Sequence, residues 1–224
     1  MTRTVHPIEQ ESFRILRSRL DTSALPPLRR AVLERVIHAS ADLAYATELV
    51  ADEEELRAAH TALHQGAPVV ADVAMVASGI TARRSVCRLA DATAAPGLTR
   101  SAHAIRLAFA EVGPGAVWVI GCAPTALEEL IALDVAPALV IGMPVGFVGA
   151  AESKARLRAC GLPAVSNVSE KGGSAVAAAA LNALLYTPYP LGEPVEAPER
   201  ADAAESADAP QSAESPEHSE ENLQ

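Results

Sequence analysis

Between residues 116 and 185, short apolar runs alternate with turn residues and helix-forming segments. The runs cover residues 117–121, 137–141 and 164–168, and the first two are apolar at every position. A run that is apolar throughout is typical of a strand buried on both faces, which occurs mainly in parallel sheets covered by helices. The alternation therefore predicts an α/β fold, a three-layer sandwich with a mostly parallel central sheet.

The first part of the chain has a different pattern, with apolar residues at the spacing of helices. Residues 28–50 and residues 52–65 are predicted to form two helices on this basis. Residues 69–76, a β-branched run, are predicted to form a strand. We therefore expect a helical N-terminal segment added to a flavodoxin/Rossmann-like sheet.

Further helices are expected after each of the later strands. The first begins near Thr125, which has the spacing of a capping box to Glu128. The others cover residues 151–160 and 174–185. Ligands of parallel sheets bind beyond the carboxyl ends of the strands. In this chain those ends carry three loops, residues 121–125, 142–149 and 169–174.

The charge of the chain is unevenly distributed. The formal net charge is −10, but residues 191–224 hold ten acids and one base, so residues 1–190 carry only −1. We expect residues 1–190 to form a single α/β domain and residues 191–224 to be a disordered acidic tail. The tail is either a docking segment or a spacer, and its composition favours the spacer. A chain without an excess of bases is not expected to bind nucleic acid.

The three cysteines, Cys87, Cys122 and Cys160, are far apart and odd in number. Neither a disulfide framework nor a zinc knuckle is indicated by such spacing. The first eleven residues are polar, unlike a secretory signal, and no apolar stretch approaches the roughly 20 residues of a membrane span. We expect a cytoplasmic protein that does not enter a membrane.

The glycine-rich loops do not match the phosphate-binding motifs of nucleotide sites, neither GxxxxGK[ST] nor GxGxxG. An anion remains a candidate ligand at Lys171, Gly172, Gly173 and Ser174, because the start of a helix presents free N–H groups and Lys171 adds a charge. The alternative is an ordinary strand-to-helix turn capped by Ser174. The loop alone does not separate the two interpretations.

Among the histidines, His38 is the candidate for chemistry. Asp42 follows it by one helical turn, and a carboxylate there would orient the imidazole and favour its cation. The alternative is a histidine at the core edge, bonded to a main-chain carbonyl. His60 and His64 have a metal-compatible spacing without a third ligand, so no metal site is predicted, and His103 is expected at the surface.

Seven blocks of this sequence, in order, resemble the precorrin-8X methylmutase family of cobalamin biosynthesis, over residues 7–185. PVGFVGAAESK at residues 144–154 is the most distinctive of them. The other blocks are HPIEQESFR at 6–14, RVIHASAD at 35–42, GAPVVAD at 66–72 with MV at 75–76 and GIT at 79–81, TRS at 99–101, APTAL at 123–127 and KGGS at 171–174.

The resemblance implies an isomerase that moves a methyl group from C-11 to C-12 of precorrin-8X, giving hydrogenobyrinate. It implies that His38 protonates ring C, that no cofactor or metal is needed, and that the chain forms a homodimer with its site near the interface. Hand-over of the product to the next pathway enzyme is a further expectation. The residues expected to bind the carboxylate-rich macrocycle are Ser12, Arg14, Thr81, Arg100, Ser101, Lys171, Gly172, Gly173 and Ser174.

Three positions depart from the family pattern. Cys122 stands where asparagine is usual, Ala74 where a polar side chain is common, and Glu170 where a basic residue is frequent. Two alternatives stay open. The first is the cobalt-precorrin-8 version of the reaction, giving cobyrinate, because the two versions of the pathway use similar enzymes, and the second is a non-catalytic corrinoid carrier. A nucleotide-binding α/β protein is a third, disfavoured alternative.

Overall fold

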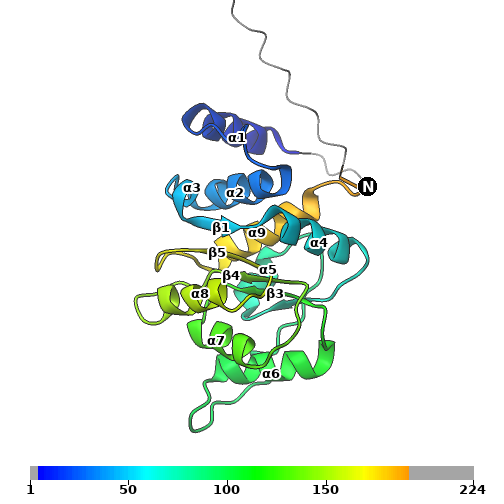
Figure 1. Ribbon diagram of the computed structural model, residues 1–224, viewed down its shortest axis with the longest axis vertical. Coiled ribbons are helices and arrows are strands. Elements are labelled where there is room, and N and C mark those ends of the chain that lie inside the picture. The colour runs from blue at the N-terminus through cyan, green and yellow to red at the C-terminus, as the bar shows by residue number, and fades with distance from the viewer. Residues whose placement is uncertain (1–4, 192–224) are drawn as a thin grey trace, which may run out of the picture. The chain divides into compact units, whose positions relative to one another are not determined.

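The computed structural model describes residues 5–191, and these residues are built around a five-stranded sheet of order β1-β5-β4-β3-β2 (Figure 1). Strands β2 to β5 are parallel, and β1 pairs antiparallel with β5 at one edge. The sheet is thus mostly parallel, as predicted. The strands are β1 (Leu49–Ala51), β2 (Val69–Ala71), β3 (Val117–Ile120), β4 (Leu139–Gly142) and β5 (Ala164–Asn167).

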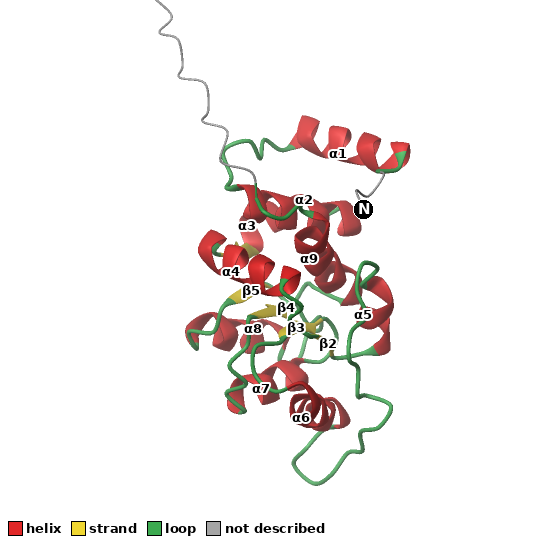
Figure 2. Ribbon diagram, turned by 90° about the vertical axis from the view of Figure 1, so that its right-hand side faces the viewer, coloured by secondary structure: helices red, strands yellow, loops and turns green. Residues whose placement is uncertain are grey.

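Helices cover both faces of this sheet and make the predicted three layers (Figure 2). One face carries α4 (Glu53–His64), α5 (Ala74–Gly79) and α9 (Ser174–Tyr186). The other face carries α6 (Arg100–Val112), α7 (Pro124–Ala132) and α8 (Ala150–Ala159). Every residue of β3 and β4 is buried between the two layers, which explains why these runs contain no charged side chain.

Two N-terminal helices add to this sandwich, α1 (Pro7–Arg19) and α2 (Pro27–Ser40). Helix α2 packs on α9 and α4, and α1 packs on α2 (Figure 2). The buried carboxylate of Glu34 on α2 ties them together, because it accepts hydrogen bonds from Arg17 and Thr22 as well as from Arg30. The helical N-terminal segment is therefore an extra layer outside the sandwich.

The prediction of a single long helix over residues 28–50 is wrong. Helix α2 ends at Ser40, where Ala41 adopts the left-handed conformation (φ 54°) and its N–H bonds the Ile37 carbonyl. A short helix, α3 (Tyr45–Glu48), and strand β1 follow. Apolar spacing continued through this stretch because β1 also buries two of its three residues, so periodicity alone did not reveal the break.

Two further expectations need correction. The strand predicted at residues 69–76 ends at Ala71, and α5 begins three residues later. The capping box at α7 does not form, since Ala123 is the N-cap and provides no side-chain bond. Thr125 instead bonds the hydroxyl of Thr99, and Glu128 pairs with Arg156.

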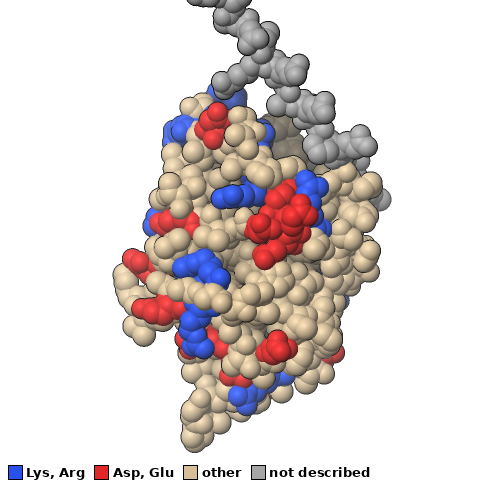
Figure 3. All heavy atoms as spheres, in the orientation of Figure 1, with Lys and Arg blue, Asp and Glu red and all other residues tan. Residues whose placement is uncertain are grey.

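The remaining elements lie within a few residues of their predicted bounds. The expected acidic tail, residues 191–224, lies outside the described residues except for Leu191. None of the helices found in residues 5–191 is long and apolar enough to cross a bilayer. On the face shown in Figure 3, the acidic and basic side chains of the described residues form separate small groups rather than one basic field.

Candidate active site

His38 lies half-buried in the last turn of α2, facing α1. Its Nδ1 is 2.7 Å from the Oγ of Ser12. Its ring stacks on Phe13, with centroids 5.1 Å apart and planes inclined by 17°. The hydroxyl and the aromatic ring together hold the imidazole in one orientation, and an imidazole exchanges protons near neutral pH.

A small cavity of about 120 Å³ adjoins this imidazole. It is bordered by apolar side chains of both N-terminal helices and by one guanidinium, that of Arg19, which has no partner among residues 5–191. The lining residues are Ser12, Ile15, Leu16, Arg19, Ile37, His38, Ala41 and Leu43.

A much larger open groove of about 840 Å³ lies along the segment that follows β2. Helix α5, the loop of residues 80–90 and the first residue of α6 form its walls. Thr81 and Arg100 both line it, so these two candidates lie in one groove. Arg84 and Arg100 have no partner in the described part of the chain, whereas Arg83 donates to the Ala67 carbonyl.

A row of contacts connects this groove to His38. The hydroxyl of Thr81 bonds that of Tyr186 at the end of α9. The guanidinium of Arg35 lies 5.2 Å from the ring centroid of Tyr186 and 4.9 Å from that of Phe13, which stacks on His38. Side chains of α9, α2 and α1 therefore link Thr81 in the groove to the imidazole of His38, although none of them lines the groove itself.

The buried carboxylate of Asp72 shapes the sheet edge beneath the groove. It follows β2 and accepts the N–H groups of Gly121, Cys122 and Ala123 at 3.1, 2.8 and 3.1 Å. Burial raises the pKa of this carboxyl, and the three N–H donors oppose that rise. Asp72 thereby fixes the turn after β3 to the end of β2.

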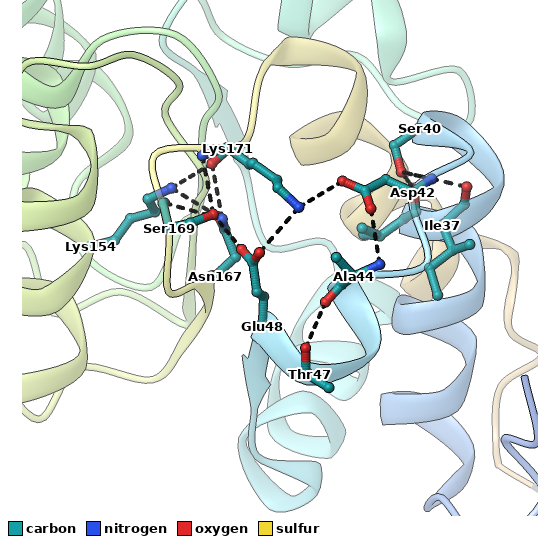
Figure 4. A network of polar contacts seen from close by, with 11 residues as sticks. Ile37, Ser40, Asp42, Ala44, Thr47, Glu48, Lys154, Asn167, Ser169 and Lys171 are labelled. Carbon is teal, nitrogen blue, oxygen red and sulfur yellow. Dashed lines mark hydrogen bonds and ion pairs between the residues drawn. The ribbon is translucent and has the colours of Figure 1, made fainter.

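The glycine loop before α9 forms a third location, separate in its bonding from the first two (Figure 4). The Lys171 ammonium is 2.9 Å from an Asp42 oxygen and 3.2 Å from one of Glu48. The N–H of Gly173 bonds the Met143 carbonyl. Lys171 and Gly173 are thus already bonded within the chain, and Gly173, not Ser174, is the N-cap of α9.

The helical spacing assumed for His38 and Asp42 does not exist, because α2 ends at Ser40. The Asp42 carboxylate accepts the Ala44 N–H and the Lys171 ammonium. The hydrogen bond from Lys171 lowers the pKa of Asp42. The side chain that hydrogen-bonds Nδ1 of the His38 imidazole is Ser12, not Asp42.

Other candidates lie away from these sites. Arg14 is exposed on α1 and pairs with Glu11, and Ser101 is half-buried in the first turn of α6. The ring of His103 bonds the main chain of Thr93. In residues 5–191 no three His, Cys, Asp or Glu side chains gather as a metal site would require.

Sequence reasoning missed Phe13, Arg35 and Tyr186, which connect His38 to the groove. Arg35 stands one helical turn before His38, and this spacing could have placed both on one face. Nothing in the sequence pattern brings Phe13 or Tyr186 to that face, since they come from helices at opposite ends of the described chain.

The model of the precorrin-8X methylmutase family matches residues 7–187. The chain belongs to this family. It is 39% identical over 196 residues to the cobalt-precorrin-8 methylmutase of Salmonella typhimurium, covering 80% of this chain and 93% of that protein. Identity to the precorrin-8X methylmutase of Pseudomonas aeruginosa is 40% over 194 residues, covering 79% and 93%.

A solved structure agrees with the fold. The precorrin-8X methylmutase of Thermus thermophilus matches with a TM-score of 0.71 and 34% identity, covering 80% of this chain and 96% of that one. As a member of the precorrin-8X methylmutase family, the chain is an isomerase of cobalamin biosynthesis.

The three departures from the family pattern occupy different places. Ala74 lines the large groove, so a side chain change there alters the groove itself. Cys122 follows β3 and donates its N–H to Asp72, and burial raises the pKa of its thiol. Glu170 contributes its carbonyl to the N–H of Gly146.

Proposed function

We propose that this chain moves a methyl group from C-11 to C-12 of precorrin-8X, giving hydrogenobyrinate, with His38 as the general acid. The observation that carries the role of His38 is its imidazole, held by Ser12 and Phe13 beside a cavity. Because Ser12 engages Nδ1, we assign the proton transfer to Nε2. Ser12 then orients the ring through the opposite nitrogen.

The reaction is an isomerisation, so substrate and product contain the same atoms. Protonation of ring C raises the electron demand at C-12, toward which the methyl group migrates with its bonding electrons. Loss of the proton afterwards restores both the ring and the imidazole. General acid catalysis of this kind typically contributes about 10²–10⁴-fold to a rate.

The large groove suits the carboxylates of such a substrate. Arg84 and Arg100 offer two guanidinium groups without partners in residues 5–191, and Thr81 adds a hydroxyl beside them. Guanidinium groups bind carboxylates through paired hydrogen bonds. We propose Arg84, Arg100 and Thr81 as the main carboxylate contacts, with Ser12, Arg14, Ser101 and the loop of Gly172, Gly173 and Ser174 as further ones.

We further propose a cytoplasmic homodimer that passes its product to the next enzyme of the pathway. Three free cysteines fit a reducing compartment. Phe147 and Val148, in the loop after β4, are 94% and 89% exposed, and exposed apolar groups of this kind mark protein contact surfaces. Sedimentation of the native chain as a monomer would contradict the dimer.

The test of the reaction is the visible spectrum of precorrin-8X over time with the native chain, His38→Gln and His64→Gln. Moving the methyl group from C-11 extends the conjugation, so turnover changes the absorption. We expect the change with the native chain and with the control His64→Gln, and a loss of about 10²-fold or more in rate with His38→Gln.

The other outcomes separate the alternatives. Binding of the pigment without any spectral change in all three proteins would support a corrinoid carrier instead. Turnover of cobalt-precorrin-8 to cobyrinate, without turnover of precorrin-8X, would assign the cobalt-containing version of the reaction. Unchanged turnover with His38→Gln would remove His38 from the acid role.

A further inference from the structure

The chain contains only two lysines, Lys154 and Lys171, and both belong to one network (Figure 4). Lys154 comes from α8, Lys171 from the loop between β5 and α9, and the acidic groups of the network from the segment after α2. The network therefore joins three parts of the chain that are distant in sequence.

Lys154 is the anchor of this network. Its side chain is 0% exposed, and its ammonium donates to the Asn167 side-chain oxygen at 3.0 Å and to the Lys171 carbonyl at 2.5 Å. Asn167 in turn donates to the same carbonyl at 2.9 Å. Burial lowers the pKa of Lys154 to about 8. A buried amine is tolerated only when it is bonded in this way, so the main chain at Lys171 is fixed.

From this fixed point the Lys171 side chain extends to the segment after α2. It pairs with Asp42 at 2.9 Å and Glu48 at 3.2 Å. Glu48 also accepts the hydroxyl hydrogen of Ser169, and Asp42 accepts the Ala44 N–H. Lys171 therefore joins the loop before α9 to residues 42–48, and the hydrogen bond between Ser169 and Glu48 joins the same two segments.

This bridge ends four residues after His38. We infer that Lys171, anchored by Lys154, is a positioning residue that holds the end of α2 so that His38 keeps its place beside Ser12. The inference rests on the proposed acid role of His38. It replaces the expectation that Lys171 clamps a substrate carboxylate, because the Lys171 ammonium already faces two carboxylates of its own chain.

The kinetic test uses Lys171→Met, Lys171→Arg and Asp42→Asn with precorrin-8X as substrate. Lys171 is 39% exposed at its side chain, so Lys171→Met is expected to fold, and thermal unfolding checks this. We expect kcat to fall about tenfold or more with KM within about twofold, since small misplacements of a reacting group cost up to about 10²-fold. Lys171→Arg is expected to restore most of kcat.

Direct binding of a substrate carboxylate by Lys171 would give the opposite result. In that case Lys171→Met raises KM and leaves kcat unchanged, whereas Asp42→Asn frees the Lys171 ammonium and lowers KM. In the positioning role, Asp42→Asn lowers kcat as Lys171→Met does, and the double variant is no worse than Lys171→Met alone. Additive losses or a change confined to KM would overturn the inference.

A second measurement does not depend on turnover. The ring signals of His38 in an NMR spectrum, assigned by their absence in His38→Gln, are expected to shift in Lys171→Met. The control Arg156→Met, which removes an exposed ion pair on α8, is expected to leave them in place. If the His38 signals do not move in Lys171→Met, the inference is contradicted. This result does not depend on whether the native chain converts precorrin-8X, and that conversion tests the proposed function separately.

Discussion

At the scale of single residues, two kinds of polar group among residues 5–191 bear on the site. Some are satisfied inside the fold, such as Glu34, Asp72 and Lys154, each buried and bonded to several partners. Others border cavities, such as His38 and Arg100. The first kind determines the shape of the site, and the second is available for chemistry.

Glu34 allows a prediction of acid sensitivity. Burial raises the pKa of its carboxyl, but hydrogen bonds from Arg17, Thr22 and Arg30 outweigh this and lower the pKa to about 2 from 4.5. The ionised form therefore stabilises the folded state above pH 4.5, and this stability is lost as the pH falls from 4.5 to about 2. The slope is up to about 1.4 kcal/mol per pH unit.

Urea unfolding of Glu34→Gln between about pH 2 and pH 6 measures this contribution. We expect a flatter dependence of the unfolding free energy on pH than in the native chain. Glu128→Gln, which removes an exposed pair with Arg156, is the control and should keep the native slope. Equal slopes in the native chain and Glu34→Gln would show that α1 is not held by this carboxylate.

Contacts within one helix can be predicted from the sequence more readily than contacts between helices, and His38 shows the physical reason. Its pairing with Asp42 assumed an unbroken helix, and the left-handed Ala41 breaks it. Ser12, which we propose as a substrate contact, also bonds the imidazole itself. Sequence spacing describes neighbours along one helix, whereas the partners of His38 come from another helix packed against it.

At the scale of elements, the parallel strands could be predicted because a strand buried on both faces requires an uninterrupted apolar run in the sequence. The short elements α3 and β1 could not, because α3 follows the left-handed turn at Ala41 and β1 forms by pairing with β5. The loop before α9 has a similar tertiary cause. Gly172 has φ +151°, and a Cβ there would lie 2.3 Å from the Met143 carbonyl oxygen.

Gly172→Ala is therefore expected to destabilise the fold by more than the cost of a strained backbone alone, which is about 1–3 kcal/mol. Gly161→Ala is the matched control, since Gly161 also has positive φ (+79°) but no atom within 4 Å of the position that a Cβ would take. The midpoints of urea unfolding compare the two. Equal losses would mean that the loop moves away from Met143 at little cost.

At the scale of the whole molecule, the distribution of unpaired arginines points to the ligand. Four arginine side chains have no partner among residues 5–191, namely Arg19, Arg29, Arg84 and Arg100. Arg84 and Arg100 line the large groove, and Arg19 lines the cavity beside His38. Because residues 1–190 carry a net charge of only −1, such local cations determine where a polyanionic ligand binds.

The two arginines of the groove that are unpaired among residues 5–191 are expected to contact the substrate directly. Arg84→Met and Arg100→Met are each expected to raise KM for precorrin-8X by about tenfold or more, since a hydrogen bond to a charged group contributes about 1.5–3 kcal/mol. Arg29→Met removes an equally unpaired charge outside both cavities and should leave KM unchanged. Steady-state kinetics at low and high salt provide the measurement, because screening weakens a general field more than a direct contact. An equal effect of all three variants would assign substrate attraction to overall charge, whereas no effect of Arg84→Met and Arg100→Met would place the carboxylates outside this groove.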